Sequence, residues 1–202
     1  MVSHKFLYVI LIFIILFLEA CGTATIKMET TPELKVGSPL SGIQPITFLI
    51  KSFRDEVGEV VSVSGVGVVK IDKSANQLFS QAITAELRRN GHTVLLHEND
   101  GKADIIIDGV VKKYLIEFRH SSWSTKAFSN AEVEMTLKKS ADATEGVSKL
   151  YKSSYECDGA LNNPHLFEDR WRNCLHEALL DIVKDFSTDP DLLDMLKKVE
   201  KL

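Results

Sequence analysis

An uninterrupted apolar run near the N-terminus limits what the rest of the chain can become. The run FLYVILIFIILFL occupies residues 6–18, follows Lys5 and is thirteen residues long. A helix that spans a bilayer needs about 20 apolar residues, with a lower limit near 17. A positive charge followed by an apolar stretch of this length is typical of a secretory signal peptide. We therefore expect residues 1–20 to be removed and the mature chain to fold outside the cytoplasm.

The residues after the run resemble a bacterial lipoprotein signal. Leu18-Glu19-Ala20-Cys21 places a branched apolar residue, a variable position and a small residue before a cysteine. The resemblance implies a diacylglyceryl group on the Cys21 sulfur and an acyl chain such as palmitate on the new amino terminus. Two or more acyl chains hold a protein firmly on a membrane. Gly22 stands where many inner-membrane lipoproteins have aspartate, which favours the outer membrane. The alternative is a secreted protein without lipid.

The composition of the mature chain fits one globular domain. Removal of the signal leaves 182 of the 202 residues and a net charge of −4, which is enough chain for a single core. A mildly acidic protein without a block of Lys and Arg is a poor nucleic-acid binder. Residues 21–45 are rich in Thr, Ser, Gly and Pro. This composition predicts a lipidated N-terminus with a flexible tether, and residues 46–202 are expected to form one periplasmic domain.

The spacing of apolar residues predicts an α+β fold. Strands are expected over 46–53 and, as a bulged strand or a hairpin, over 58–71, and a helix with one apolar stripe follows from Ser74. Four strand-like segments come next, among them a cleanly alternating one from Ala131. A second helix is expected from Asn163 and a short one near Pro190. The prediction is a mainly antiparallel sheet with two packed helices, in the order strands, helix, strands, helix, plus a short C-terminal helix.

Two cysteines remain once Cys21 is assigned to lipid. In an oxidising compartment Cys157 and Cys174 can form a disulfide. They can equally remain a free buried pair, since Cys174 falls on the apolar face of the predicted second helix. No second His or Cys lies at ligand spacing, so no metal site is expected. Motif searches give no nucleophile, phosphate loop or cofactor site.

Several short motifs resemble the YajG family of bacterial lipoproteins. They are the cysteine signal, the Thr- and Pro-rich segment, SFRDEVGEV at 52–60, ELRRNGHTV at 86–94 and ADIIIDGVVKKYLIEF at 103–118. Similar domains occur in transport-auxiliary and secretion-associated lipoproteins. The resemblance covers about residues 45–187. It implies an envelope-anchored, non-enzymatic domain and no catalytic residues.

The expected function is therefore that of a lipid-anchored binding or assembly module, with an envelope protein or a second copy of the chain as partner. The alternatives are a ring-forming or auxiliary subunit of an envelope secretion or transport system and, less favoured, a small periplasmic hydrolase. Residues 117–130 are expected to form a surface loop that makes the contact. Its candidate residues are Trp123 and Phe128, with Arg119 and Lys126 as basic flanks. The other interpretation is that Trp123 caps the edge of the sheet.

Overall fold

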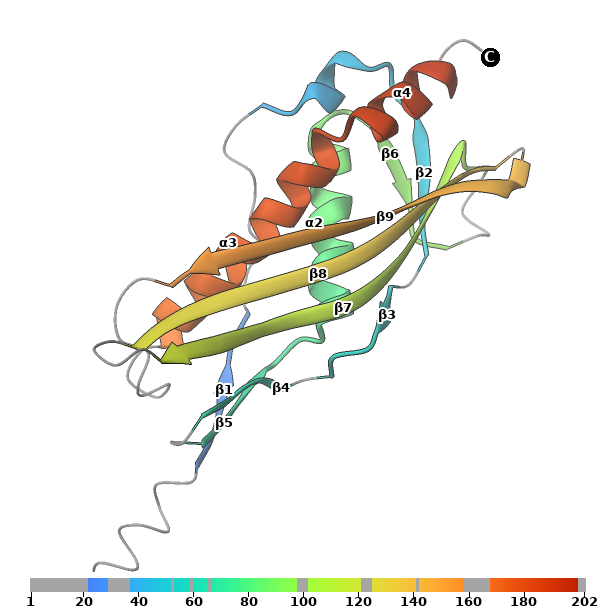
Figure 1. Cartoon of the computed structure of the whole chain (residues 1–202). Coiled ribbons are helices and arrows are strands. Elements are labelled where there is room, and N and C mark those ends of the chain that lie inside the picture. The colour runs from blue at the N-terminus through green and yellow to red at the C-terminus, as the bar shows by residue number, and fades with distance from the viewer. Residues whose placement is uncertain are drawn as a thin grey trace, which may run out of the picture.

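Figure 1 shows a computed structural model of the chain. Several sequence predictions lie outside the residues that the structure describes: the signal peptide, Cys21, Trp123 and the start of the second helix at Asn163. The described residues are 22–28, 37–51, 53–58, 60–64, 67–97, 102–120, 125–140, 142–157 and 168–199.

The larger of two sheets has six strands and is mixed. Its strands are β2 (Thr47–Ile50), β3 (Arg54–Asp55), β6 (Thr93–Leu95), β7 (Ile105–His120), β8 (Thr125–Lys139) and β9 (Asp142–Glu156). The order is β6-β2-β7-β8-β9, with β3 beside β7. β7, β8 and β9 are antiparallel, whereas β2 runs parallel to both β6 and β7. The α+β class is confirmed, but "mainly antiparallel" is too narrow. A helix separates β2 from β6 in the chain, and crossover connections of this kind join parallel strands.

In the described ranges, three α-helices accompany the sheets: α2 (Ala75–Arg89), α3 (Glu168–Ser187) and α4 (Pro190–Val199). In Figure 1, α2 and α3 lie together on one face of β7, β8 and β9. Burial recurs at helical spacing on both, as expected for a helix that packs one stripe on a sheet. Gly91 follows the C-cap Asn90 of α2, and its φ of 88° suits a residue without Cβ. The stripes are formed by Leu78, Phe79, Ala82, Ile83 and Leu87 of α2 and by Trp171, Leu175, Ala178, Leu179 and Ile182 of α3.

A second, three-stranded sheet begins where a tether was expected. β1 (Gly22–Ile26) pairs in parallel with β5 (Gly67–Ile71), and β5 pairs antiparallel with β4 (Val60–Ser64). Ile26 and Met28 are buried, and so is Leu40 in the short 3-10 helix Pro39–Gly42. The prediction of a flexible tether over 21–45 is therefore wrong for the described part of that range. The prediction relied on the average composition of the range, in which Thr, Ser, Gly and Pro outnumber the few apolar residues that pack.

A bulge in β7 keeps one face of the large sheet apolar along its whole length. Up to Val111 the odd-numbered residues of β7 face the helices. The register then shifts between Val111 and Lys113, so the even-numbered Tyr114 and Ile116 take over the buried positions. An extra residue in one strand changes the side-chain phase in this way. The long strand can therefore serve a single core despite the change in its sequence pattern.

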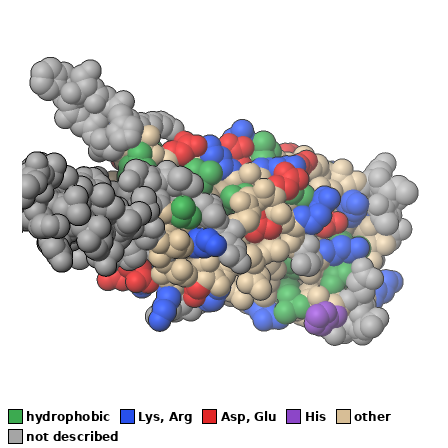
Figure 2. Space-filling view, turned by 90° about the horizontal axis from the view of Figure 1, so that it is seen from below, with side chains coloured by type: hydrophobic (Ala, Val, Ile, Leu, Met, Phe, Trp, Pro, Cys, Tyr) green, Lys and Arg blue, Asp and Glu red, His purple; other side chains and the backbone are tan. Residues whose placement is uncertain are grey.

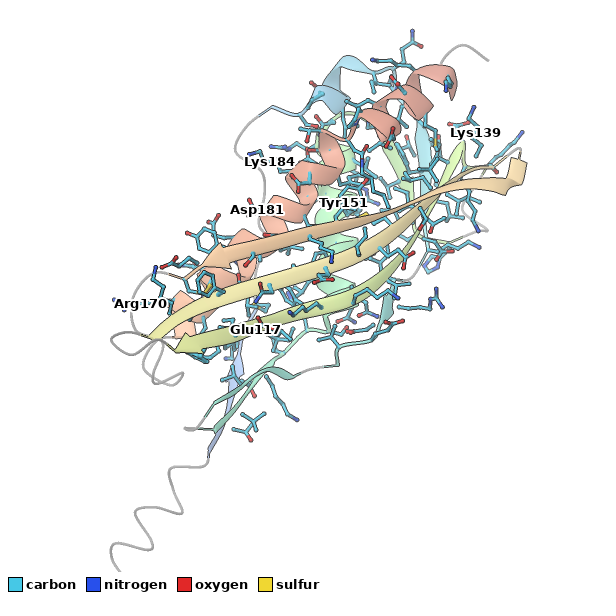
Figure 3. All side chains as sticks on the ribbon, in the orientation of Figure 1. Glu117, Lys139, Tyr151, Arg170, Asp181 and Lys184 are labelled. Atoms are coloured by element: carbon cyan, nitrogen blue, oxygen red, sulfur yellow. A yellow bond between two sulfur atoms is a disulfide. The ribbon has the colours of Figure 1, made fainter. Side chains whose placement is uncertain are left out.

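The opposite face of the same strands, the open face, carries paired charges. Figure 3 labels one residue of each face: Tyr151 lies between β9 and the helices, and Glu117 lies on the other side of the sheet. Ion pairs cross from strand to strand or run along one strand. They are Lys112–Glu134 (3.6 Å), Lys113–Glu117 (2.7 Å), Lys126–Glu156 (2.7 Å) and Lys152–Glu132 (3.3 Å).

Candidate functional site

The residue after Cys21 is already part of a strand. Gly22 pairs with Gly67 of β5, and Gly67 also pairs with Ser64 of β4. In the next row of the sheet, Thr23 and Val68 lie side by side. We call these five residues the anchor end, because the position predicted to carry lipid directly precedes them. A lipid on Cys21 would therefore join a folded sheet without a linker.

A disulfide connects β9 to α3. Cys157 and Cys174 are bonded, with their Cα atoms 5.3 Å apart, and they are 17 positions apart in sequence. The backbone around the bridge is also hydrogen-bonded. The Cys157 N–H donates to Ala127 O (2.8 Å), and the Ser129 hydroxyl donates to Cys174 O (2.6 Å). The alternative of a free buried pair does not describe this structure.

The predicted contact loop over 117–130 is mostly β-hairpin. β7 continues to His120 and β8 starts at Thr125, so Arg119 and Phe128 are strand residues. Lys126 forms the open-face ion pair with Glu156 already described. Loop composition misled the prediction, since the polar residues Thr125, Ser129 and Asn130 belong to β8. Trp123 lies outside the described residues, so neither interpretation of it is decided.

Asp189 ties the junction of α3 and α4 to β9. Its carboxylate is buried and accepts hydrogen bonds from the Tyr151 hydroxyl (2.6 Å) and the Asp191 N–H (2.9 Å), and Lys149 Nζ lies 2.7 Å from Oδ2. Burial alone would raise the pKa of Asp189, but the hydrogen bonds from Lys149 and Tyr151 outweigh it and lower that pKa. Burial, together with Asp189, raises the pKa of Tyr151. These groups satisfy one another, as in a structural network.

β9 is a long edge strand. Among the described residues it pairs only with β8. The Cys157–Ala127 hydrogen bond, followed by an unbroken register from Phe128–Glu156 to Lys138–Gly146, assigns the odd-numbered residues of this part of β9 to β8. The even-numbered residues then direct their N–H and C=O groups to the free edge. Val147 and Leu150, at 41% and 44% exposure, are two of the three large hydrophobic side chains most exposed among the described residues.

A groove of about 440 Å³ runs along the outer side of α2. Its described lining combines apolar Phe53 and Leu96 with amides and hydroxyls of α2, and it contains no carboxylate. Arg88 is the one charged residue of that lining, and its Nη2 donates to Val94 O at 3.2 Å. Without an acid, a base or a nucleophile pair, the groove can bind a ligand but supplies no acid–base chemistry.

A histidine of α3 with a perturbed pKa is structural in its surroundings. His176 on α3 has a buried Nε2 without a hydrogen-bond partner. Burial, together with the positive charges of Arg172 and Lys73, lowers its pKa to about 4.

Within the described ranges, no group of three His, Cys, Asp or Glu residues is placed to hold a metal ion. None of the described helices is both long and apolar enough to cross a membrane.

Comparison with known proteins then identifies the family. Residues 56–197 match the family model Lipoprotein_16, described as "Uncharacterized lipoprotein". The chain belongs to this lipoprotein family. Membership makes it a bacterial lipoprotein of the cell envelope. A search of curated proteins finds no significant match.

Solved structures support the fold at low sequence identity. Protein XCC0632 from Xanthomonas campestris has a TM-score of 0.58 at 10% identity, covering 87% of this chain and 99% of that one. The hypothetical protein CT253 from Chlamydia trachomatis has a TM-score of 0.49 at 8% identity, covering 78% and 99%. Lipoprotein GNA1162 from Neisseria meningitidis has a TM-score of 0.35 at 14% identity, covering 68% and 96%. Only the first supports an argument, and that argument concerns the fold of this lipoprotein alone.

Proposed function

We propose that the chain is a lipid-anchored, periplasm-facing module that binds or assembles with a protein partner along β9. Cys21 holds the anchor, the domain carries no enzymatic activity, and the outer membrane is its location. Membership of the lipoprotein family supports the anchor, and Gly22 supports the outer membrane. The short motifs that resemble the YajG family belong to the same proposal.

The observation that carries the proposal is the exposed edge of β9. Fifteen residues long, β9 offers a row of backbone donors and acceptors on its free side. Unprotected edges of this length are templates for strand pairing, and most proteins shorten or cover them. Val147 and Leu150 lie on opposite faces of the strand. An added strand would partly cover both side chains while satisfying the backbone, which is the β-augmentation mode of recognition.

The position of β9 fits an anchored protein. The small sheet contacts β7 through β4, and two strands, β7 and β8, separate that contact from β9. In Figure 1, β1 lies at one end of the molecule and α4 lies at the other. A membrane at the β1 end would thus leave β9 accessible from the periplasm.

The second candidate is a self-assembling or auxiliary subunit of an envelope transport or secretion system. Among the described residues, the outermost strands of the main strand order are β9, with fifteen residues, and β6, with three. Pairing β9 with β9 of a second copy uses the same surface twice and closes a dimer. Pairing β9 with β6 of the next copy is head-to-tail and can close a ring. The stoichiometry of the purified protein therefore separates the two candidates.

The test replaces an apolar edge residue with a charge. Leu150→Lys is expected to abolish crosslinking to the partner from a photoreactive residue at Ser148. Leu96→Lys, at a side chain of similar exposure (49%) beside β6, is the matched control: it should leave crosslinking to a separate partner intact and should weaken crosslinking only where β9 pairs with β6 of the next copy. Light scattering on the wild type then separates the two candidates. A monomer supports binding to a separate partner. A discrete oligomer that Leu150→Lys dissociates supports self-assembly. Undiminished crosslinking in Leu150→Lys would exclude β9 as the contact.

Anchoring is tested separately. The wild type should incorporate an alkyne fatty acid in cells, and Cys21→Ser should not. Label that persists in Cys21→Ser would place the lipid elsewhere and remove the anchor from the proposal.

A further inference from the structure

We infer that the anchor end (Gly22, Thr23, Ser64, Gly67 and Val68) enters the headgroup region of the membrane that holds the Cys21 lipid. The inference rests on the proposed anchoring at Cys21 and goes beyond it. A lipid alone fixes one atom of the protein to the bilayer, whereas a second contact fixes the orientation of the domain.

The strand register places the anchor end close to the residue that carries the lipid. Gly22 is the residue after the anchor and lies level with Gly67 and Ser64. Because β1 belongs to the sheet from its first residue, no slack chain separates the lipid from the end of β4 and β5. The acyl chains of Cys21 must leave the protein beside these strand ends.

The chemistry of this end differs from the rest of the surface. Residues 60–69 (VVSVSGVGVV) carry no charge, and neither do residues 22–26 (GTATI). Elsewhere charges are dense: Figure 2 shows Lys and Arg interspersed with Asp and Glu over much of the described surface. An uncharged end beside a lipid attachment site fits a membrane, because an apolar group such as the Val68 side chain favours transfer out of water.

Lys70, the first charged residue along β5 from the anchor end, would lie at the depth of the lipid phosphates. Thr25 and Val60 share a row with Lys70, three residues along β5 from Gly67. A strand rises about 3.3 Å per residue, so roughly 10 Å separates Lys70 from the end of the sheet. Interfacial segments bury their apolar side to about 5–10 Å. Lys70 would then meet anionic headgroups while the uncharged rows lie below them.

The experiment measures depth with a fluorophore. The full chain carrying Ser64→Cys is purified in its acylated form and labelled with an environment-sensitive dye, since Cys21 is acylated and Cys157 and Cys174 are bonded. It is reconstituted into vesicles of phosphatidylethanolamine and phosphatidylglycerol, with or without lipid bearing a nitroxide near the headgroup. The dye is expected to shift to the blue and to lose most of its emission to the nitroxide. Lys198→Cys on α4 is the control and should do neither.

Two substitutions at Val68 test whether the contact is apolar. Within the Ser64→Cys chain, Val68→Asp should restore most of the emission, and the isosteric Val68→Thr should not. An acylated protein whose dye at position 64 is neither shifted nor quenched would overturn the inference and leave the anchor standing. Equal quenching in Val68→Asp and Val68→Thr would also overturn it. A purified protein whose mass shows no acyl chains would refute the proposed anchor, and the inference with it.

Discussion

The two faces of β7, β8 and β9 are built from the same strands but are stabilised differently. The face toward the helices buries Val111, Tyr114, Val133 and Met135 completely. The open face has pairs such as Lys152–Glu132, in which the lysine is 60% exposed. Burial of apolar area is a major source of folding free energy, whereas exposed ion pairs contribute about 0–1 kcal/mol each. The open face and the β9 edge can therefore change, or bind a partner, at little cost to stability.

The largest effect is expected where neighbouring residues of β8 face opposite ways. Met135→Ala should lower the free energy of unfolding by about 2–5 kcal/mol, because it leaves a cavity in a packed core. Glu134→Ala, one residue away on the open face, should change it by less than about 0.5 kcal/mol. Urea unfolding followed by circular dichroism measures both. Similar losses in the two variants would contradict the difference between the faces.

The disulfide should stabilise the helix-covered face by a comparable amount. Replacing Cys157 and Cys174 with alanine frees a loop whose ends are 17 positions apart, and closing a loop of this size is worth about 3 kcal/mol. The double variant should unfold at markedly lower urea than the wild type, and reduction of the wild type should reproduce most of that loss. Two freely alkylating thiols in the denatured, unreduced wild type would show that the bridge does not form.

Asp189→Asn tests the polar contact between β9 and the two C-terminal helices. The loss should be about 2 kcal/mol, because the buried partner Tyr151 exchanges a carboxylate for a weaker acceptor. The folded pKa of Asp189 is lowered, so its contribution is complete above about pH 3.9, the ordinary aspartate value. It disappears as the pH falls through the lower folded pKa. The asparagine variant should accordingly show a shallower loss of stability in acid. An unchanged acid slope would assign that loss to other carboxylates.

The sequence predicted features that depend on neighbouring residues and missed features that depend on residues far apart in the chain. Alternation from Ala131 predicted the buried residues of β8, and helical spacing predicted the stripe of α2, because both signals are local. Which strand forms an edge depends on β2 inserting between β6 and β7, and no local pattern reports that. The pairing of Gly22 with Gly67 is equally non-local. The sequence held one signal for the edge: alternation along residues 148–156 places the apolar Leu150 on the face opposite Tyr151 and Ser153.

His176 should make the helix-covered face sensitive to mild acid. Its folded pKa of about 4 lies below the ordinary 6.5, so the unfolded chain binds the proton first as the pH falls. Stability should be complete above pH 6.5 and decline toward pH 4. His176→Leu should flatten this part of the profile, measured as the melting temperature against pH. A residual slope is expected from His92, whose pKa burial also lowers. An unaltered profile would mean that His176 is not kept neutral by burial.

The smallest effect is predicted for the open face itself. A double-mutant cycle on Lys152→Ala and Glu132→Ala should give a coupling energy below about 0.5 kcal/mol, since the 3.3 Å contact is solvated and screened by salt. Raising the salt concentration should reduce even that. The cycle isolates the pair because each single variant removes the same contact without creating another. A coupling above about 1 kcal/mol would mean that the open face is stabilised by its charges. Changes on the β8–β9 side of the sheet would then cost folding stability, contrary to what partner binding along β9 requires.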